Sequence, residues 1–147
     1  SWALEATGML EFRQREIACL SGGQRQRVWV AMALARQTNI VLLHEPTTYL
    51  DLSHQLEVLE ILKHLNREQG TTIVMVLHDL NLASRYSDYL LAMKDGQIAR
   101  YGTPEEVMTR DVLAECFFID GDVVTDRRSG KPVCLSYDLL AAKEGRV

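Results

Sequence analysis

The sequence predicts an α/β fold in which a parallel sheet is flanked by helices. Two short apolar segments rich in branched side chains, residues 40–43 and 71–77, have the composition of fully buried strands. Each follows a longer segment, residues 24–37 or 51–70, in which apolar residues recur at helical spacing. Helices that alternate with buried strands are typical of a parallel sheet built from β-α-β units.

The composition suits one such domain or a large piece of one. The chain has 147 residues, a net charge of −4, and 47% hydrophobic and 24% charged residues. Its longest apolar run, residues 28–35, has eight residues, whereas a membrane-spanning helix needs roughly 18–20. Acidic residues outnumber basic ones by 20 to 16, so the net charge does not favour duplex nucleic acid as a partner. We therefore expect no bilayer span and no nucleic-acid partner.

The three cysteines, Cys19, Cys116 and Cys134, are odd in number and far apart in the chain. They form no CxxC pair and have no histidine at the spacing of a metal site. This usage predicts free thiols in a reducing compartment.

The two long helices have recognisable ends and apolar faces. Gly22 and Gly23 precede the first, whose predicted apolar face consists of Val28, Ala31, Met32 and Ala35. Asp51 is placed to cap the start of the second and Gly70 to end it. Its predicted apolar stripe consists of Leu52, Leu56, Leu59, Leu62 and Leu65.

The rest of the chain predicts shorter elements. They are a helix over residues 79–85, a hairpin of residues 89–93 and 97–100 with an Asp-Gly turn, a helix start at residues 103–106, and a hairpin of residues 119–125 and 132–135. We expect residues 1–118 to form the main domain. Residues 119–147 are expected to form a small hairpin extension with a structural or docking role.

The first chemical signal is the segment Leu-Ser-Gly-Gly-Gln at residues 20–24, directly before a predicted helix. Ser21 offers a hydroxyl, and Gly22 and Gly23 allow a ligand to approach the backbone closely. The start of a helix offers unpaired N–H groups and the positive end of the helix dipole, which together suit a terminal phosphate. Taken alone, the same five residues also fit a serine cap followed by a flexible turn.

Three further polar residues follow in order. Glu45 stands where the strand of residues 40–43 ends, at the edge where open α/β sheets bind ligands, and could activate a water molecule as a general base. Asp51 is a predicted helix cap, and His78 follows the second strand. Considered alone, Glu45 also fits a solvated loop residue, Asp51 a simple helix cap, and His78 an ordinary histidine at the end of a strand.

Together, these residues resemble the motifs of an ABC-transporter ATPase, in order and in spacing. Residues 20–24 resemble the signature motif, the strand ending in Glu45 resembles the Walker B strand, residues 49–51 resemble the D-loop, and His78 resembles the switch histidine. The resemblance extends from Glu5 to about Cys116. The amino-acid sequence of residues 25–27, 47–51 and 102–107 looks most like that of the ATPases of iron–siderophore, haem and cobalamin importers.

The resemblance implies a function and a set of site residues. Members of this family bind ATP and Mg²⁺ between two ATPase subunits paired head to tail, and they power a membrane permease from the inner, cytoplasmic face of the membrane. Ser21, Gly22, Gly23 and Gln24 would then contact the γ-phosphate bound to the partner subunit. Glu45 would activate water, His78 would contact the γ-phosphate, and Asp51 would couple the two sites.

One family feature is missing from these 147 residues. A phosphate loop requires the pattern G-x-x-x-x-G-K-[ST]. The only Gly-Lys pair here, Gly130-Lys131, is followed by Pro132 and lacks the earlier glycine. The family would place that loop, the Gln-loop and the adenine-stacking aromatic in roughly one hundred residues before Ser1. We expect the chain to be the C-terminal portion of such an ATPase and to hydrolyse no ATP by itself.

A second departure is His44, which stands where the family has an aspartate. A carboxylate oxygen suits Mg²⁺, whereas an imidazole brings a softer nitrogen and removes a negative charge. We therefore expect Mg²⁺ placement to suffer and no intact metal site to be present. Zinc binding by His44 has no partner ligands nearby in the sequence.

Two alternative functions remain open. The chain could be a non-catalytic, truncated subunit that only dimerises or docks on a permease. It could also be the C-terminal half of an SMC-type chromosome ATPase. Residues 1–17 show no heptad coiled coil, and the hairpin followed by residues 103–106 favours the transporter family.

Overall fold

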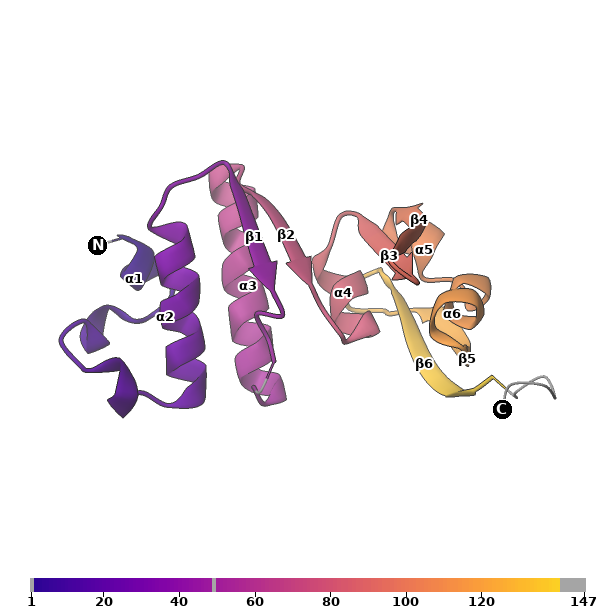
Figure 1. Ribbon diagram of the computed structural model, residues 1–147, viewed down its shortest axis with the longest axis horizontal. Helices are drawn as coiled ribbons and strands as arrows, with labels where there is room; N and C mark the ends of the chain where they lie inside the picture. The colour runs from indigo at the N-terminus through magenta and orange to yellow at the C-terminus, as the bar shows by residue number, and fades with distance from the viewer. Residues whose placement is uncertain (1, 49, 141–147) are drawn as a thin grey trace. The chain divides into compact units, whose positions relative to one another are not determined.

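The computed structural model describes residues 2–48 and 50–140 of the chain, which divides into two compact units, Ser1–Leu77 and His78–Val147. Each unit has a hydrophobic core of its own, and Figure 1 shows the order of their helices and strands. No helix among the described residues is both long enough and apolar enough to cross a membrane.

The first unit combines helices with a parallel strand pair. Its elements are α1 (Trp2–Ala6), the 3-10 turns η1 (Leu10–Phe12) and η2 (Ile17–Cys19), α2 (Gly22–Leu34), β1 (Ile40–His44), α3 (Leu52–Gln69) and β2 (Thr72–Val76). In Figure 1, α2 and α3 lie side by side and the two strands run along α3. Strands β1 and β2 pair in parallel, from Ile40 opposite Thr72 to His44 opposite Val76. The predicted parallel α/β arrangement is confirmed.

Only one face of this strand pair is covered by the described residues. Val41 is buried, and Leu43, Ile73 and Met75 pack against the same core. The residues on the other face are exposed: Ile40 58%, Leu42 74%, Val74 54% and Val76 48%. The prediction of fully buried strands is therefore wrong, because the helices of this unit cover one side of the pair only.

The ends of α3 follow the sequence signals, and the buried faces of α2 and α3 agree with the prediction in part. Asp51 caps α3, and Gly70 ends it with a left-handed φ of +66°, as predicted. The residues that α3 buries are Val58, Leu59, Leu62 and Leu65, whereas Leu52 is exposed. Helix α2 buries Val30, Ala31 and Leu34, and Met32 is exposed. Several neighbouring faces of a helix fit the same spacing, and packing against α1 and α3 selects one.

The described residues of the second unit, 78–140, form two antiparallel hairpins and three short helices. Its elements are α4 (Leu80–Tyr86), β3 (Leu90–Lys94), β4 (Gln97–Gly102), α5 (Pro104–Val107), α6 (Arg110–Phe117), β5 (Ile119–Thr125) and β6 (Pro132–Leu139). Asp95 and Gly96, with φ of +50° and +75°, form the predicted turn between β3 and β4. Both predicted hairpins are confirmed, and β6 extends beyond its predicted end at residue 135.

The β5–β6 hairpin packs against helices of the second unit. Asn81 of α4 donates to the Cys134 carbonyl at 3.0 Å and accepts from the Cys134 N–H at 2.8 Å. Ser84 donates its hydroxyl hydrogen to the Pro132 carbonyl at 2.6 Å. Cys134 also joins Leu113 of α6 in a small buried cluster. The boundary between residues 118 and 119 stays a prediction.

Candidate functional site

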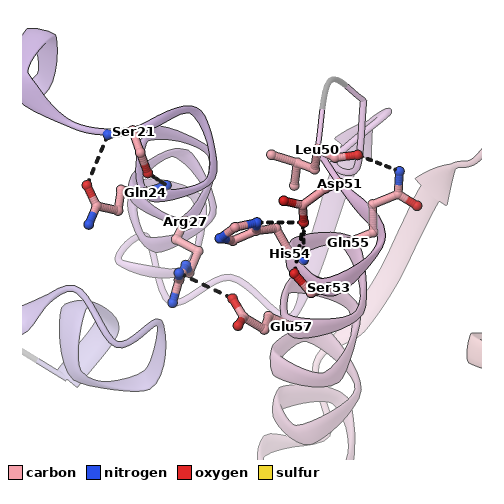
Figure 2. A network of polar contacts seen from close by, with 9 residues as sticks. All are labelled: Ser21, Gln24, Arg27, Leu50, Asp51, Ser53, His54, Gln55 and Glu57. Carbon is pink, nitrogen blue, oxygen red and sulfur yellow. Dashed lines mark hydrogen bonds and ion pairs between the residues drawn. The ribbon is translucent and has the colours of Figure 1, made fainter.

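Residues 21–24 form a capping box at the start of α2. The Ser21 hydroxyl accepts a hydrogen bond from the Gln24 backbone N–H at 3.2 Å, and the Gln24 side-chain oxygen accepts from the Ser21 N–H at 3.0 Å (Figure 2). This arrangement satisfies two donors of the helix start. The N–H groups of Gly22 and Gly23 have no intrahelical partner at such a position. The turn therefore offers a hydroxyl and backbone donors suited to an anion.

The two glycines of this turn have different surroundings. A Cβ added to exposed Gly22 would meet no atom within 4 Å, so a ligand can approach the backbone there. Gly23 is buried, and a Cβ on it would lie 2.7 Å from Cδ2 of His54. Gly22 is thus open to a ligand, whereas Gly23 leaves room for a side chain of α3.

Asp51 is held by several donors at the start of α3. One carboxylate oxygen accepts from the His54 backbone N–H at 3.0 Å and from the Ser53 hydroxyl at 2.9 Å, and it lies 2.7 Å from His54 Nδ1 (Figure 2). These bonds lower the pKa of Asp51 from 3.8 to about 2, with the His54 backbone N–H as the largest cause. Asp51 is therefore ionised at neutral pH.

The starts of α2 and α3 lie next to each other in the first unit. His54 contacts the position of Gly23 on one side and Asp51 on the other. Further along the two helices, Arg27 and Glu57 form an ion pair at 3.2 Å (Figure 2). The structure thus brings the predicted phosphate-binding turn and the predicted coupling aspartate together, with His54 between them.

Glu45 lies at the carboxyl end of β1, as predicted, in an uncommon backbone conformation. Its φ is +50°, and its N–H donates to the Val76 carbonyl at 3.2 Å. Its carboxylate accepts from the Thr48 hydroxyl at 3.0 Å, and its side chain is 26% exposed. A left-handed φ is costly for a residue other than glycine, and such strain clusters at functional sites.

His44 precedes Glu45 and points largely into solvent. Its Nε2 lies 3.6 Å from a Glu45 carboxylate oxygen, and its side chain is 82% exposed. Within residues 2–48 and 50–140, no group of three or more histidine, cysteine, aspartate or glutamate side chains is arranged to hold a metal ion.

His78 is exposed and is the first residue of the second unit. Glu45 belongs to the first unit. The structure gathers the turn at residues 21–24 with Asp51, and it places Glu45 at the strand end of the same unit.

The sequence analysis missed His54. The spacing of Asp51 and His54 is that of a helix cap and the third residue of the helix, where side chains commonly interact. That signal could have identified the contact with Asp51. The contact with Gly23 joins residues of two different helices, so no local pattern predicts it.

Comparison with known proteins agrees with the motifs. A protein-family model described as "ABC transporter" matches residues 1–48. The iron(3+)-hydroxamate import ATP-binding protein FhuC of Bacillus subtilis is 61% identical over 139 residues, which are 95% of this chain and 52% of the relative. The ferric enterobactin transport ATP-binding protein FepC of Escherichia coli is 45% identical over 89% of this chain and 48% of the relative. The chain spans about half the length of the curated relatives it matches.

Solved structures show the same fold. An inward-facing putative metal-chelate type ABC transporter matches with a TM-score of 0.80 and 29% identity, over 92% of this chain and 55% of that one. A dimeric ATP-binding cassette bound to ADP and Pi matches with a TM-score of 0.62 and 37% identity, over 69% of this chain and 44% of that one.

The chain has the fold of the C-terminal part of an ABC ATPase domain. Among ABC ATPases, its sequence resembles the ATP-binding proteins of iron–siderophore importers.

Proposed function

We propose that this chain is part of the ATP-binding subunit of an ABC importer that takes up an iron–siderophore complex or a related metal chelate. The names of the relatives, which cover iron(3+)-hydroxamate, petrobactin and enterobactin import, support this substrate class. The subunit would act at the inner, cytoplasmic face of the cell membrane, bound to a permease and to a second ATPase subunit. The chain spans about half the length of each of these relatives, so the proposed ATP-driven import is the activity of a protein of their full length.

One observation carries the proposal at the level of the site. The capping box at residues 21–24 leaves the Ser21 hydroxyl exposed and the space beside Gly22 open, and His54 lies between this turn and ionised Asp51. A terminal phosphate fits this turn, because the hydroxyl and the first N–H groups of α2 can donate to its oxygens. In the proposed head-to-tail dimer, Ser21, Gly22, Gly23 and Gln24 contact the γ-phosphate of ATP held by the other subunit.

Glu45 is the proposed general base. Its position at a strand end and its partly exposed carboxylate suit a residue that accepts a proton from an attacking water. The hydrogen bond from Thr48 orients the carboxylate. Asp51 is proposed to couple the two nucleotide sites, and His78 is proposed to contact the γ-phosphate.

The residues near Glu45 do not fit Mg²⁺. The side chain at position 44 is an imidazole directed into solvent, and the described residues gather no set of oxygen ligands around it. We propose that the 147 residues hydrolyse no ATP by themselves, since they also contain no phosphate-loop motif.

Restoring the aspartate at position 44 tests this proposal. The chain would be joined to the part of Bacillus subtilis FhuC that it does not cover, and Mg²⁺-dependent ATPase activity would be measured for the parent and for His44→Asp. We expect His44→Asp to raise the activity at a fixed, limiting Mg²⁺ concentration by about tenfold or more, because losing even an indirect metal contact costs about 10- to 100-fold in affinity. In the His44→Asp background, Glu45→Gln should abolish turnover.

His64→Asp is the matched control, because His64 is exposed on α3 and lies outside the site. Equal rates for the parent and His44→Asp would contradict the proposed role of position 44. If both joined proteins were inactive yet still dimerised or bound a permease, the chain would be a non-catalytic docking module.

A further inference from the structure

His54 has no role in the motifs that led to the proposed function, yet it lies between two of them. Its Nδ1 is 2.7 Å from an Asp51 carboxylate oxygen. The other side of the ring faces Gly23, where an added Cβ would lie 2.7 Å from Cδ2, 3.1 Å from Cγ and 3.3 Å from Nε2. One imidazole thus contacts the start of α3 and the start of α2.

Both contacts restrict the directions in which the ring can move. The contact with Asp51 joins a ring nitrogen to an ionised carboxylate, and hydrogen bonds of this kind are among the stronger ones in proteins. On the opposite side, buried Gly23 allows the α2 backbone to approach the ring more closely than any other residue could. A displacement of Asp51 must therefore move the ring against the turn at residues 21–24.

An ion pair also links α2 and α3, but it contributes little. Arg27 and Glu57 form an ion pair with partly exposed side chains, 23% and 49%, and such pairs contribute little to stability. They also lie further along α2 and α3, away from Ser21 and Asp51 (Figure 2). The alignment of the two helix starts therefore depends mainly on the apolar core and on His54.

We propose that His54 is a positioning residue of the nucleotide site, which holds Asp51 and the phosphate-binding turn at residues 21–24 in a fixed relation through Gly23. The inference rests on the proposed function, because the turn and Asp51 are assigned their nucleotide roles there. Through His54, a movement of the coupling aspartate reaches the residues that contact phosphate.

The test separates the hydrogen bond of His54 from its bulk. His54→Leu keeps an apolar side chain beside Gly23 but loses the donor to Asp51. His54→Asn carries an amide N–H close to the position of Nδ1 and restores a donor. His64→Leu is the matched control, since it makes the same change at an exposed position of the same helix.

The first measurement uses this chain without nucleotide. Nuclear magnetic resonance would follow the amide signals of Gly22, Gly23 and Gln24 while the pH is lowered through the Asp51 titration, and would also give their hydrogen-exchange rates. We expect the chemical shifts of the three amides to change as Asp51 is protonated in the parent, His54→Asn and His64→Leu. In His54→Leu they should not change with the protonation of Asp51. Exchange at Gln24, whose N–H donates to the Ser21 hydroxyl, should be about tenfold faster in His54→Leu, because a bond to a charged group that positions this turn is lost.

The second measurement is the ATPase activity of the joined protein in the His44→Asp background. We expect His54→Leu to lower kcat several-fold with little change in KM, and His54→Asn to recover most of the loss.

Two results of the first measurement would overturn the proposal. One is that the amide chemical shifts of the parent do not change as Asp51 is protonated, and the other is that they change in the same way in His54→Leu and His54→Asn. An active joined protein whose kcat is the same with histidine and leucine would also overturn the proposal. A joined protein that is inactive in every form would count against the proposed function, while the amide signals would still decide the role of His54.

Discussion

The side-chain hydrogen bonds at the candidate site of the first unit differ in sequence range from those that hold the β5–β6 hairpin of the second. In the first unit, the contacts of Ser21 with Gln24, Glu45 with Thr48, and Asp51 with His54 each join residues three positions apart. In the second unit, Asn81 reaches Cys134 across 53 positions and Ser84 reaches Pro132 across 48. The local contacts shape an accessible surface, whereas the distant contacts hold the fold together. Substitutions in the two groups should therefore have different consequences.

The largest expected effect is on stability, from Asn81→Ala in the second unit. The substitution removes both hydrogen bonds to Cys134 and leaves its N–H and carbonyl without their partner. We expect the free energy of unfolding to fall by about 2–4 kcal/mol, because each such group costs about 1–3 kcal/mol when left unsatisfied. Urea unfolding followed by circular dichroism would measure the change.

The reactivity of the cysteines shows whether the effect stays in the second unit. Cys134 and Cys116 are buried, whereas Cys19 of the first unit is exposed. Asn81→Ala should accelerate the reaction of the buried thiols with a thiol reagent and leave Cys19 unchanged. Gln97→Ala, at an exposed position of β4, serves as the control. Unchanged labelling of Cys134 in Asn81→Ala would mean that the two hydrogen bonds do not hold the hairpin.

A smaller loss of stability is expected from Gly23→Ala in the first unit. The new Cβ would lie 2.7 Å from His54 Cδ2, so the ring or the helix must move. We expect a cost of about 1–3 kcal/mol, as for overpacking of a well-packed site. Gly22→Ala is the matched control, because nothing lies within 4 Å of its Cβ position. The cost should shrink in a His54→Ala background, and an equal cost in both backgrounds would refute the steric explanation.

A further effect of pH is expected at the start of α3. The folded-state pKa of Asp51 is lowered from 3.8 to about 2, so the carboxylate stabilises the folded state above about pH 4 and this contribution is lost as the pH falls toward 2. Carbon-13 carboxyl signals should show the Asp51 midpoint near 2. Asp51→Asn should remove this part of the acid sensitivity of α3. A midpoint at the ordinary value of an aspartate would show that the cap is not formed.

The smallest effect is expected for the ion pair between Arg27 and Glu57. A double-mutant cycle with Arg27→Ala and Glu57→Ala should give a coupling free energy below about 1 kcal/mol, since the pair is partly exposed. The coupling should decrease further at high salt. A coupling of several kcal/mol would mean that this pair, and not His54, aligns the starts of α2 and α3.

The elements could be predicted where the signals were local. Asp51 and Gly70 mark the ends of α3, the Asp-Gly pair marks the β3–β4 turn, and Thr103 with Pro104 marks the start of α5. The buried residues of α2 and α3 could be predicted only in part, because neighbouring faces of a helix have apolar residues at similar spacing. The exposed face of β1 and β2 was also missed, since composition does not report how many layers cover a strand.

The residues of the candidate site also fall into those that a local pattern predicts and those that only a contact between distant segments identifies. Ser21, Gln24, Asp51 and Glu45 lie where their motifs predict, at the starts of two helices and the end of a strand. His54 was missed, because its importance depends on Gly23, which is distant in the chain but adjacent in space.

Short patterns along the chain were enough to predict the order of helices and strands, the capping of α2 and α3, and the motifs that resemble those of an ABC ATPase. These properties depend on residues a few positions apart, whose hydrogen bonds and dihedral angles are local. Three other properties became known from the folded chain: His54 fills the space beside Gly23, Asn81 holds Cys134, and one face of the β1–β2 pair is exposed. These properties depend on which segments pack together, and packing is decided by the whole set of contacts within each unit.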